Sequence, residues 1–262
     1  MLPATSPAYE HGLRIRSVPA GSAWRWLALG WADLRRCPVP GLVHGAAATL
    51  FGWLLLALAG NRFWLLAGAF SGFLLVAPIV ATGLYAVSRR LEEQRPATLA
   101  SALAVWRPQD SRLVVFGALL ALAGTGWVLT SAGLITRFAS APVDTPADFL
   151  RVVLVADSNH LFEAWLLLGS VLAAPIFASS VVAIPLLLDR RDSVLAAVGA
   201  SVGATVANPV ALALWATLIL LLTMLGMATA MLGLIVVVPW LAHASWHAYR
   251  DLVEPVDVPG KP

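Results

Sequence analysis

Cysteine is almost absent from this sequence, since Cys37 is the only one among 262 residues. A single thiol excludes an intramolecular disulfide and any metal site built from paired cysteines. Charged side chains are also scarce, at 12% of the residues against 60% for hydrophobic ones. One water-soluble globule cannot bury that much apolar surface, so lipid is the expected surrounding of most of the chain.

The motifs of common enzyme classes are missing as well. The sequence contains no glycine-rich phosphate loop, no nucleophile elbow and no zincin helix. The net charge is only +3, and the arginines cluster beside apolar stretches rather than among aromatic residues. This pattern argues against a nucleic-acid partner. We therefore expect a non-enzymatic protein without a cofactor, and the lipid bilayer is its first expected partner.

Long windows without charge, one of them interrupted only by Glu163, mark six expected membrane crossings. A helix needs about 20 apolar residues to cross ~30 Å of hydrocarbon. One window, from Ser193 to Tyr249, is too long for a single crossing and is divided into an interfacial stretch and two spans, with a turn near Gly226. The expected fold is all-α, a polytopic membrane helix bundle with short interfacial helices. Its six spans are Pro38–Asn61, Phe63–Ser88, Leu113–Thr136, Leu161–Leu188, Pro209–Leu225 and Met227–His247.

The distribution of arginine predicts the orientation of these spans. In a six-span topology, only Arg62, Arg137 and Arg151 lie on one side, and the other fourteen of the 17 Lys and Arg residues lie opposite. The positive-inside rule places the arginine-rich side, and with it both termini, in the cytoplasm. We expect a flexible segment over residues 1–21, a membrane domain over 22–252 and a cytoplasmic tail over 253–262.

A threefold internal repeat is indicated by the recurrence of four features in the same order. They are an amphipathic stretch, a break at a proline, a span, and a second span that contains a proline. The units run over Trp24–Arg90, Leu99–Arg191 and Val194–Arg250. The alternative is that Ala-Pro-Ile recurs by chance in a lipid-adapted composition. Because spacing, topology and charge recur together, the repeat is the preferred interpretation.

Two sets of prolines follow from the repeat. Proline disfavours helix in the residue before it, so Cys37-Pro38, Arg107-Pro108 and Asn208-Pro209 are expected helix ends. Within the second spans, proline frees a backbone carbonyl and kinks the helix. The kinked helices can line a pathway along the repeat axis, with Thr82 and Ser179 as polar lining, or they can simply pack together. The prolines at these kinks are Pro78, Pro175 and Pro239.

Three histidines form a candidate metal or haem site. His243 and His247 are four residues apart and share one helical face, and His44 is expected at the same membrane depth. The alternative is a belt of polar and aromatic side chains where the sixth span leaves the bilayer. Because no cysteine or carboxylate accompanies these histidines in the sequence pattern, the belt is the preferred interpretation.

Glycine pairs with four-residue spacing predict close contacts between helices. They support a compact bundle or a dimer, and packing is their expected role. The pairs are Gly41 with Gly45, Gly68 with Gly72, and Gly199 with Gly203.

The segment Ser71-Gly72-Phe73-Leu74-Leu75-Val76-Ala77-Pro78 is followed by Gly83-Leu84-Tyr85 and Ser88-Arg89-Arg90-Leu91-Glu92. These residues resemble a family of bacterial predicted integral membrane proteins of unknown function, over about Trp24 to Tyr249. Some members of that family are labelled as cytochrome c oxidase. The resemblance implies a location in the bacterial inner membrane. A haem–copper catalytic subunit needs more spans and more intramembrane histidines than this chain has, which leaves an accessory role.

The leading hypothesis is therefore a structural or accessory component of the inner membrane, beside a respiratory complex, with another membrane protein or a second copy as partner. The alternative is a channel or uncoupled small-solute transporter. A centre filled with side chains favours the first hypothesis. A water-sized passage bounded by Thr82 and Ser179 favours the second.

Overall fold

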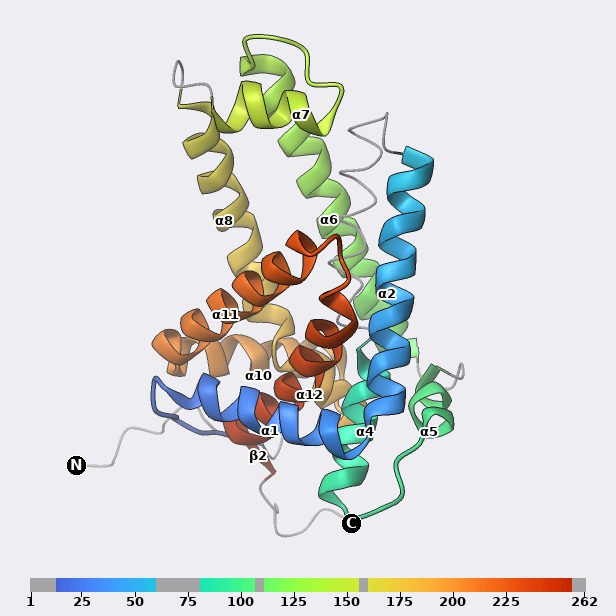
Figure 1. Ribbon diagram of the computed structural model, residues 1–262. Coiled ribbons are helices and arrows are strands. Elements are labelled where there is room, and N and C mark those ends of the chain that lie inside the picture. The colour runs from blue at the N-terminus through green and yellow to red at the C-terminus, as the bar shows by residue number, and fades with distance from the viewer. Residues whose placement is uncertain (1–12, 60–80, 107–110, 156–159, 256–262) are drawn as a thin grey trace, which may run out of the picture.

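The computed structural model describes residues 13–59, 81–106, 111–155 and 160–255, which are almost entirely helical (Figure 1). A two-stranded ribbon is the exception. The elements are β1 (Leu13–Ile15), α1 (Ser22–Arg36), α2 (Pro38–Ala59), α4 (Thr82–Glu92), α5 (Leu99–Leu103), the 3-10 helix η1 (Ala104–Trp106), α6 (Ser111–Phe138), α7 (Pro146–Phe149), the π-helical η2 (Leu150–Leu154), α8 (Leu161–Ser180), α9 (Ala183–Asp189), α10 (Val194–Ala207), α11 (Pro209–Ala228), α12 (Leu234–Leu252) and β2 (Val253–Pro255).

Helices begin at the prolines where breaks were expected. α1 ends at Arg36 and α2 begins at Pro38, and α10 ends at Ala207 before α11 begins at Pro209. A proline is tolerated in the first turn of a helix because the amide it lacks would have no intrahelical partner there. The third expected break, Arg107-Pro108, lies outside the described residues.

Four stretches within the described residues are long and apolar enough to cross a membrane, and they coincide with expected spans one, three, four and five. The second expected span lies mostly outside the described residues, and only its end is seen, in α4. The sixth coincides with α12, which is not one of the four because histidines and charged residues occupy its second half. The four stretches are Pro38–Ala57, Ser111–Phe138, Leu161–Asp189 and Pro209–Ala228.

The turn between α11 and α12 lies later than the sequence indicated. α11 continues past Gly226 to Ala228, and the chain reverses over Thr229–Gly233. The Thr229 hydroxyl accepts a hydrogen bond from the Gly233 amide at 2.7 Å, and Ala230 and Met231 adopt positive φ. The hydroxyl closes the turn and fixes its position, because Gly226 and Met227 are compatible with continued helix.

Helix α12 packs against α1, α2, α4 and α11. Glycine allows two of these contacts to be close. At Gly30 in α1, a Cβ atom would lie 2.5 Å from the backbone nitrogen of Ala244, and at Gly45 in α2 it would overlap the backbone of Ile235. Gly41 approaches Pro239 and Leu34, so the first expected glycine pair packs against α12.

The other two glycine pairs are described only in part. A Cβ at Gly203 in α10 would meet Ile15 of β1. Gly68 and Gly72 lie outside the described residues.

The main core lies at the end of the molecule that carries α1, α10 and the ribbon, here called the base (Figure 1). The short helices α4 and α9 pack there against α12 and against each other. Trp26 of α1 and Trp215 of α11 meet edge to face, with ring centroids 5.8 Å apart, and both are fully buried. Large aromatic residues therefore fill the space between the elements of the base.

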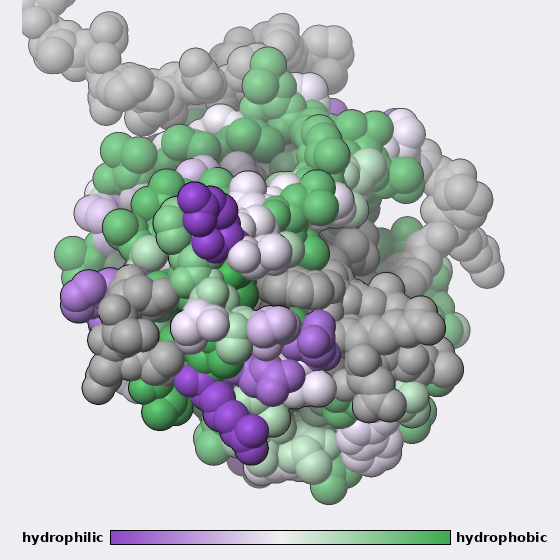
Figure 2. Space-filling model, turned by 90° about the horizontal axis from the view of Figure 1, so that it is seen from above, coloured by the Kyte–Doolittle hydropathy of each residue, from purple (hydrophilic) through white to green (hydrophobic). Residues whose placement is uncertain are grey.

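A smaller core joins α6 and α8 at the opposite end, beneath α7 and η2. It contains Ile135, Val153 and Leu161, and the Trp165 indole donates to the hydroxyl of Ser131 at 2.7 Å. Seen toward this end, hydrophilic residues gather near the middle of the view and hydrophobic residues surround them (Figure 2). The sides of α6 are strongly exposed and apolar, with Leu122 and Leu129 more than two thirds accessible, as expected for contact with lipid.

The ribbon ties together the two ends of the described chain. Strands β1 and β2 are antiparallel, with Leu13 opposite Pro255 and Ile15 opposite Val253. The turn between α10 and α11 holds the segment after β1, because Asn208 accepts from the Val18 amide and donates to the Arg16 carbonyl. No local pattern in the sequence indicates this pairing of strands, because their residues are more than 200 positions apart.

Candidate functional site

Buried and half-buried polar side chains from four helices form a cluster inside the base, here called the polar cluster. Few polar groups are buried in a bundle of this composition, so each is expected to have a hydrogen-bond partner. Asp33, Ser88 and His243 are each at most 5% exposed, and His44 is 7% exposed. The cluster consists of Asp33 in α1, His44 in α2, Ser88 in α4, and His243 and His247 in α12.

Each histidine of the polar cluster bonds to a different partner. His44 donates from Nδ1 to the carbonyl oxygen of Pro40 at 2.7 Å, one turn back in its own helix. The Nδ1 atom of His243 lies 2.7 Å from the Ser88 hydroxyl, and His247 donates from Nε2 to the Asp33 carboxylate at 2.8 Å. His243 therefore joins α12 to α4, and His247 joins α12 to α1.

The structure brings the three predicted histidines to one region but does not aim them at a common centre. Among the residues it describes, no group of three or more His, Cys, Asp or Glu side chains is arranged to hold a metal ion. The Nε2 atom of His243 is buried and has no hydrogen-bond partner among the residues that the structure describes. The hydrogen bonds of His243 and His247 are of the kind that polar side chains form when they hold neighbouring helices together.

Sequence reasoning missed Asp33 and Ser88. A signal for Asp33 exists, because it is the only acidic residue between His11 and Leu91. An isolated carboxylate in so apolar a stretch needs a partner when it is buried. Ser88 carries no comparable signal, since serine in a membrane helix often bonds to its own backbone. Only the packing of α4 against α12 identifies it.

Replacing Ser88 by alanine tests the polar cluster. Ser88→Ala leaves the buried Nδ1 of His243 without its partner, which is expected to cost about 1–3 kcal/mol of stability. Thermal unfolding in mild detergent measures this cost. The control is Ser179→Ala, because the Ser179 hydroxyl bonds to the Ile176 carbonyl of its own helix, and a change below about 0.5 kcal/mol is expected there. Equal melting temperatures for both variants would contradict the assignment.

An ion network joins α4, α9 and α12 where these helices end at the base. The Arg250 guanidinium lies 3.0 Å from Glu92 Oε1, and the Trp246 indole donates to Glu92 Oε2 at 3.1 Å. The Tyr249 hydroxyl donates to Asp189 at 2.8 Å, and Arg89 lies 3.7 Å from the same carboxylate. Burial and the Asp189 carboxylate raise the pKa of Tyr249, so the phenol stays a hydrogen-bond donor.

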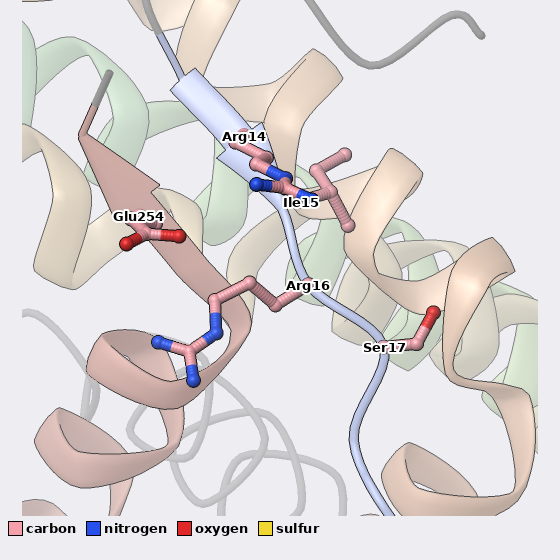
Figure 3. Close-up of a pocket in the computed structure, with 5 residues that line it drawn as sticks. All are labelled: Arg14, Ile15, Arg16, Ser17 and Glu254. Carbon is pink, nitrogen blue, oxygen red and sulfur yellow. The ribbon is translucent and has the colours of Figure 1, made fainter. Parts of the chain in front are cut away.

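The ribbon carries a surface pocket of about 500 Å³, lined by Arg14, Ile15, Arg16, Ser17 and Glu254 (Figure 3). Neighbouring side chains of a strand point to opposite faces. Ile15 packs toward Gly203 of α10, so Arg14 of β1 and Arg16, the residue after the strand, lie on the face that points away from α10. The pocket is thus an open basic surface with one carboxylate.

The residues proposed for a transport pathway are only partly described. Pro175 lies inside α8 and Pro239 inside α12, whereas Pro78 falls outside the described residues. Thr82 is buried at the start of α4. The Ser179 hydroxyl bonds within its own helix. The described residues of this set belong to three helices, with Thr82 in α4, Pro175 and Ser179 in α8, and Pro239 in α12.

Comparison with known proteins gives a match only to a family model, over slightly less than half of the chain. No curated protein and no solved structure matches it. One family model does match, from residue 65 to the end of α9 at residue 189. The resemblance inferred from the sequence is therefore confirmed, since residues 65–189 match the family described as predicted integral membrane protein (DUF2189).

Proposed function

We propose that this protein is a structural or accessory component of the bacterial inner membrane, associated with a larger membrane complex such as a respiratory one. The observation that carries the proposal is that side chains fill the interior of the base. Where α4, α9 and α12 meet, Leu84, Ile184, Leu187 and Trp246 are at most 1% exposed. Close packing of this kind suits a rigid scaffold, since a solute pathway needs a wetted or movable centre.

The proposal includes six crossings with both ends in the cytoplasm and a threefold repeat. The order of elements supports the repeat, because each proposed unit has a short helix, then a long helix, then a second helix. The units correspond to α1–α2–α4, α5–α6–α8/α9 and α10–α11–α12. The second helices of all three units converge in the ion network, in which Glu92, Asp189 and Arg250 each come from a different unit.

A permeability measurement separates the scaffold from its rival, a channel or uncoupled transporter. Purified protein in liposomes is expected to leave the swelling rates in a panel of small neutral and charged solutes equal to those of protein-free liposomes. A protein-dependent rate for any solute would favour the transport pathway instead. Migration of the native protein with a larger assembly in mild detergent is the second expected result, and migration as a free monomer would contradict an accessory role.

Cysteine labelling tests the orientation. In a Cys37→Ser background, Asp144→Cys places the only thiol in the loop before α7, and Arg95→Cys places it between α4 and α5. Both positions are exposed. A membrane-impermeant maleimide is expected to label Asp144→Cys in intact cells, and Arg95→Cys only after permeabilisation. The reverse pattern would invert the proposed topology, and labelling of both in intact cells would contradict the number of crossings.

A further inference from the structure

The elbow between α1 and α2 carries two adjacent arginines, Arg35 and Arg36, in the last turn of α1. With Ala32 they line a surface pocket of about 330 Å³. α1 lies across the base and α2 rises steeply from its end (Figure 1). The pocket thus lies where the chain turns from the base into a candidate membrane span.

No carboxylate neutralises these two guanidinium groups in the part of the chain that the structure describes. Every ion pair found there involves other residues. The nearest acidic residue in the sequence, Asp33, is buried and bonded to His247. The elbow therefore has two positive charges available to an external anion.

The two edges of the exposed face of α1 differ. On one edge, Trp31 meets Trp240 in the middle of α12, with ring centroids 5.3 Å apart. On the other edge, Arg25 pairs with Asp251 at the end of α12. In the proposed placement the middle of α12 lies deeper in the membrane than its end, so the edge of α1 that carries Trp31 faces the membrane interior. Arg35, one turn after Trp31, lies on that edge. Tryptophan at such a position is typical of the headgroup region.

Apolar side chains continue from the elbow along α2. Val39 is 60% exposed, and Leu42 and Val43 are each at least 40% exposed, in the first two turns. A phosphate held by the arginines would have these side chains beside it, on the membrane side. This combination of paired cations and an adjacent apolar strip matches the two parts of a phospholipid.

We propose that the elbow binds an anionic phospholipid, with its phosphate between Arg35 and Arg36 and an acyl chain along Val39, Leu42 and Val43. The inference rests on the proposed membrane placement. Arginine suits this role because its planar guanidinium donates two parallel hydrogen bonds to phosphate oxygens. The bound lipid would fix α1 in the plane of the headgroups.

Native mass spectrometry of the protein in mixed micelles of phosphatidylglycerol and phosphatidylethanolamine tests the proposal. The wild-type protein is expected to retain phosphatidylglycerol in preference. Arg35→Gln with Arg36→Gln should lower that preference at least about fivefold, because it removes both cations that attract the anionic headgroup. Arg35→Lys with Arg36→Lys keeps the charge and should retain most of the preference.

The ribbon supplies a matched control. Arg14→Gln with Arg16→Gln removes the same charge from the face of β1 that points away from α10, and the lipid preference should not change. An equal loss in both double variants would overturn the site in favour of general charge attraction. Displacement of the lipid by millimolar inorganic phosphate alone would identify a free-phosphate site instead. Wild-type protein that does not insert into lipid would count against the membrane placement itself.

Discussion

Gly45→Leu is expected to cause the largest loss of stability of any single substitution considered for this protein. A side chain at this position would overlap the carbonyl oxygen of Ile235, and its Cβ would lie 2.6 Å from the carbonyl carbon. Backbone cannot move aside as a flexible side chain can, so α2 and α12 must separate. Overpacking costs of about 3 kcal/mol are expected, which lower the melting temperature by roughly 10 °C.

The contact between α2 and α12 matters because it positions the polar cluster. His44 lies one residue before Gly45, and His243 lies two turns after Ile235. Separation of the helices would therefore also disturb the hydrogen bonds of these histidines.

Gly126→Leu is the matched control for this experiment. Gly126 lies in α6, another candidate span, and a Cβ there meets no atom within 4 Å. Leucine is also a better helix former than glycine. The control is expected to melt at or slightly above the wild-type temperature, and a similar loss in both variants would show that the effect does not come from helix contact.

Asn208→Ala is expected to detach the N-terminal segment from the base. The Asn208 side chain is 4% exposed and makes three hydrogen bonds to backbone groups, with the Val18 amide at 2.8 Å and with the carbonyls of Arg16 and Ala204 at 3.0 Å each. Its loss leaves these groups unpaired, at about 1–3 kcal/mol for each group that stays buried. Detachment of the N-terminal segment from the base is therefore the response with the lowest free-energy cost.

Hydrogen exchange with mass spectrometry measures this release. Exchange over residues 13–18 and 253–255 is expected to rise at least about tenfold, because the ribbon loses its attachment to the turn between α10 and α11. Thr217→Ala is the control, since the Thr217 hydroxyl is exposed and bonds to the Ala213 carbonyl of its own helix. Unchanged exchange in Asn208→Ala would show that the ribbon is held by its own strand pairing.

Asn208 also illustrates what local sequence can reveal. The proline after it predicted a helix end, and α10 ends there. The same residue was not recognised as the anchor of the N-terminal segment, because its partners Arg16 and Val18 are about 190 positions away. A boundary follows from neighbouring residues, whereas a long-range hydrogen bond follows from the folded chain.

The histidines also separate what the local sequence reveals from what only the folded chain reveals. Their spacing correctly predicted that His243 and His247 occupy one helix, and the structure places His44 in the neighbouring α2. Spacing along one helix cannot reveal what faces it. α1 presents Asp33 to His247 and α4 presents Ser88 to His243, so these two histidines take part in contacts between helices.

The sequence by itself determined the membrane class, the helical content and the helix ends at Pro38 and Pro209, since apolar length and the missing amide of proline act within a few residues. The tertiary structure alone decided that α12 lies against α1, α2 and α4, that the late turn at Thr229 sets its start, and that β1 pairs with β2. These features depend on close fit between distant segments. Such fit is a property of the assembled helices and not of any one of them.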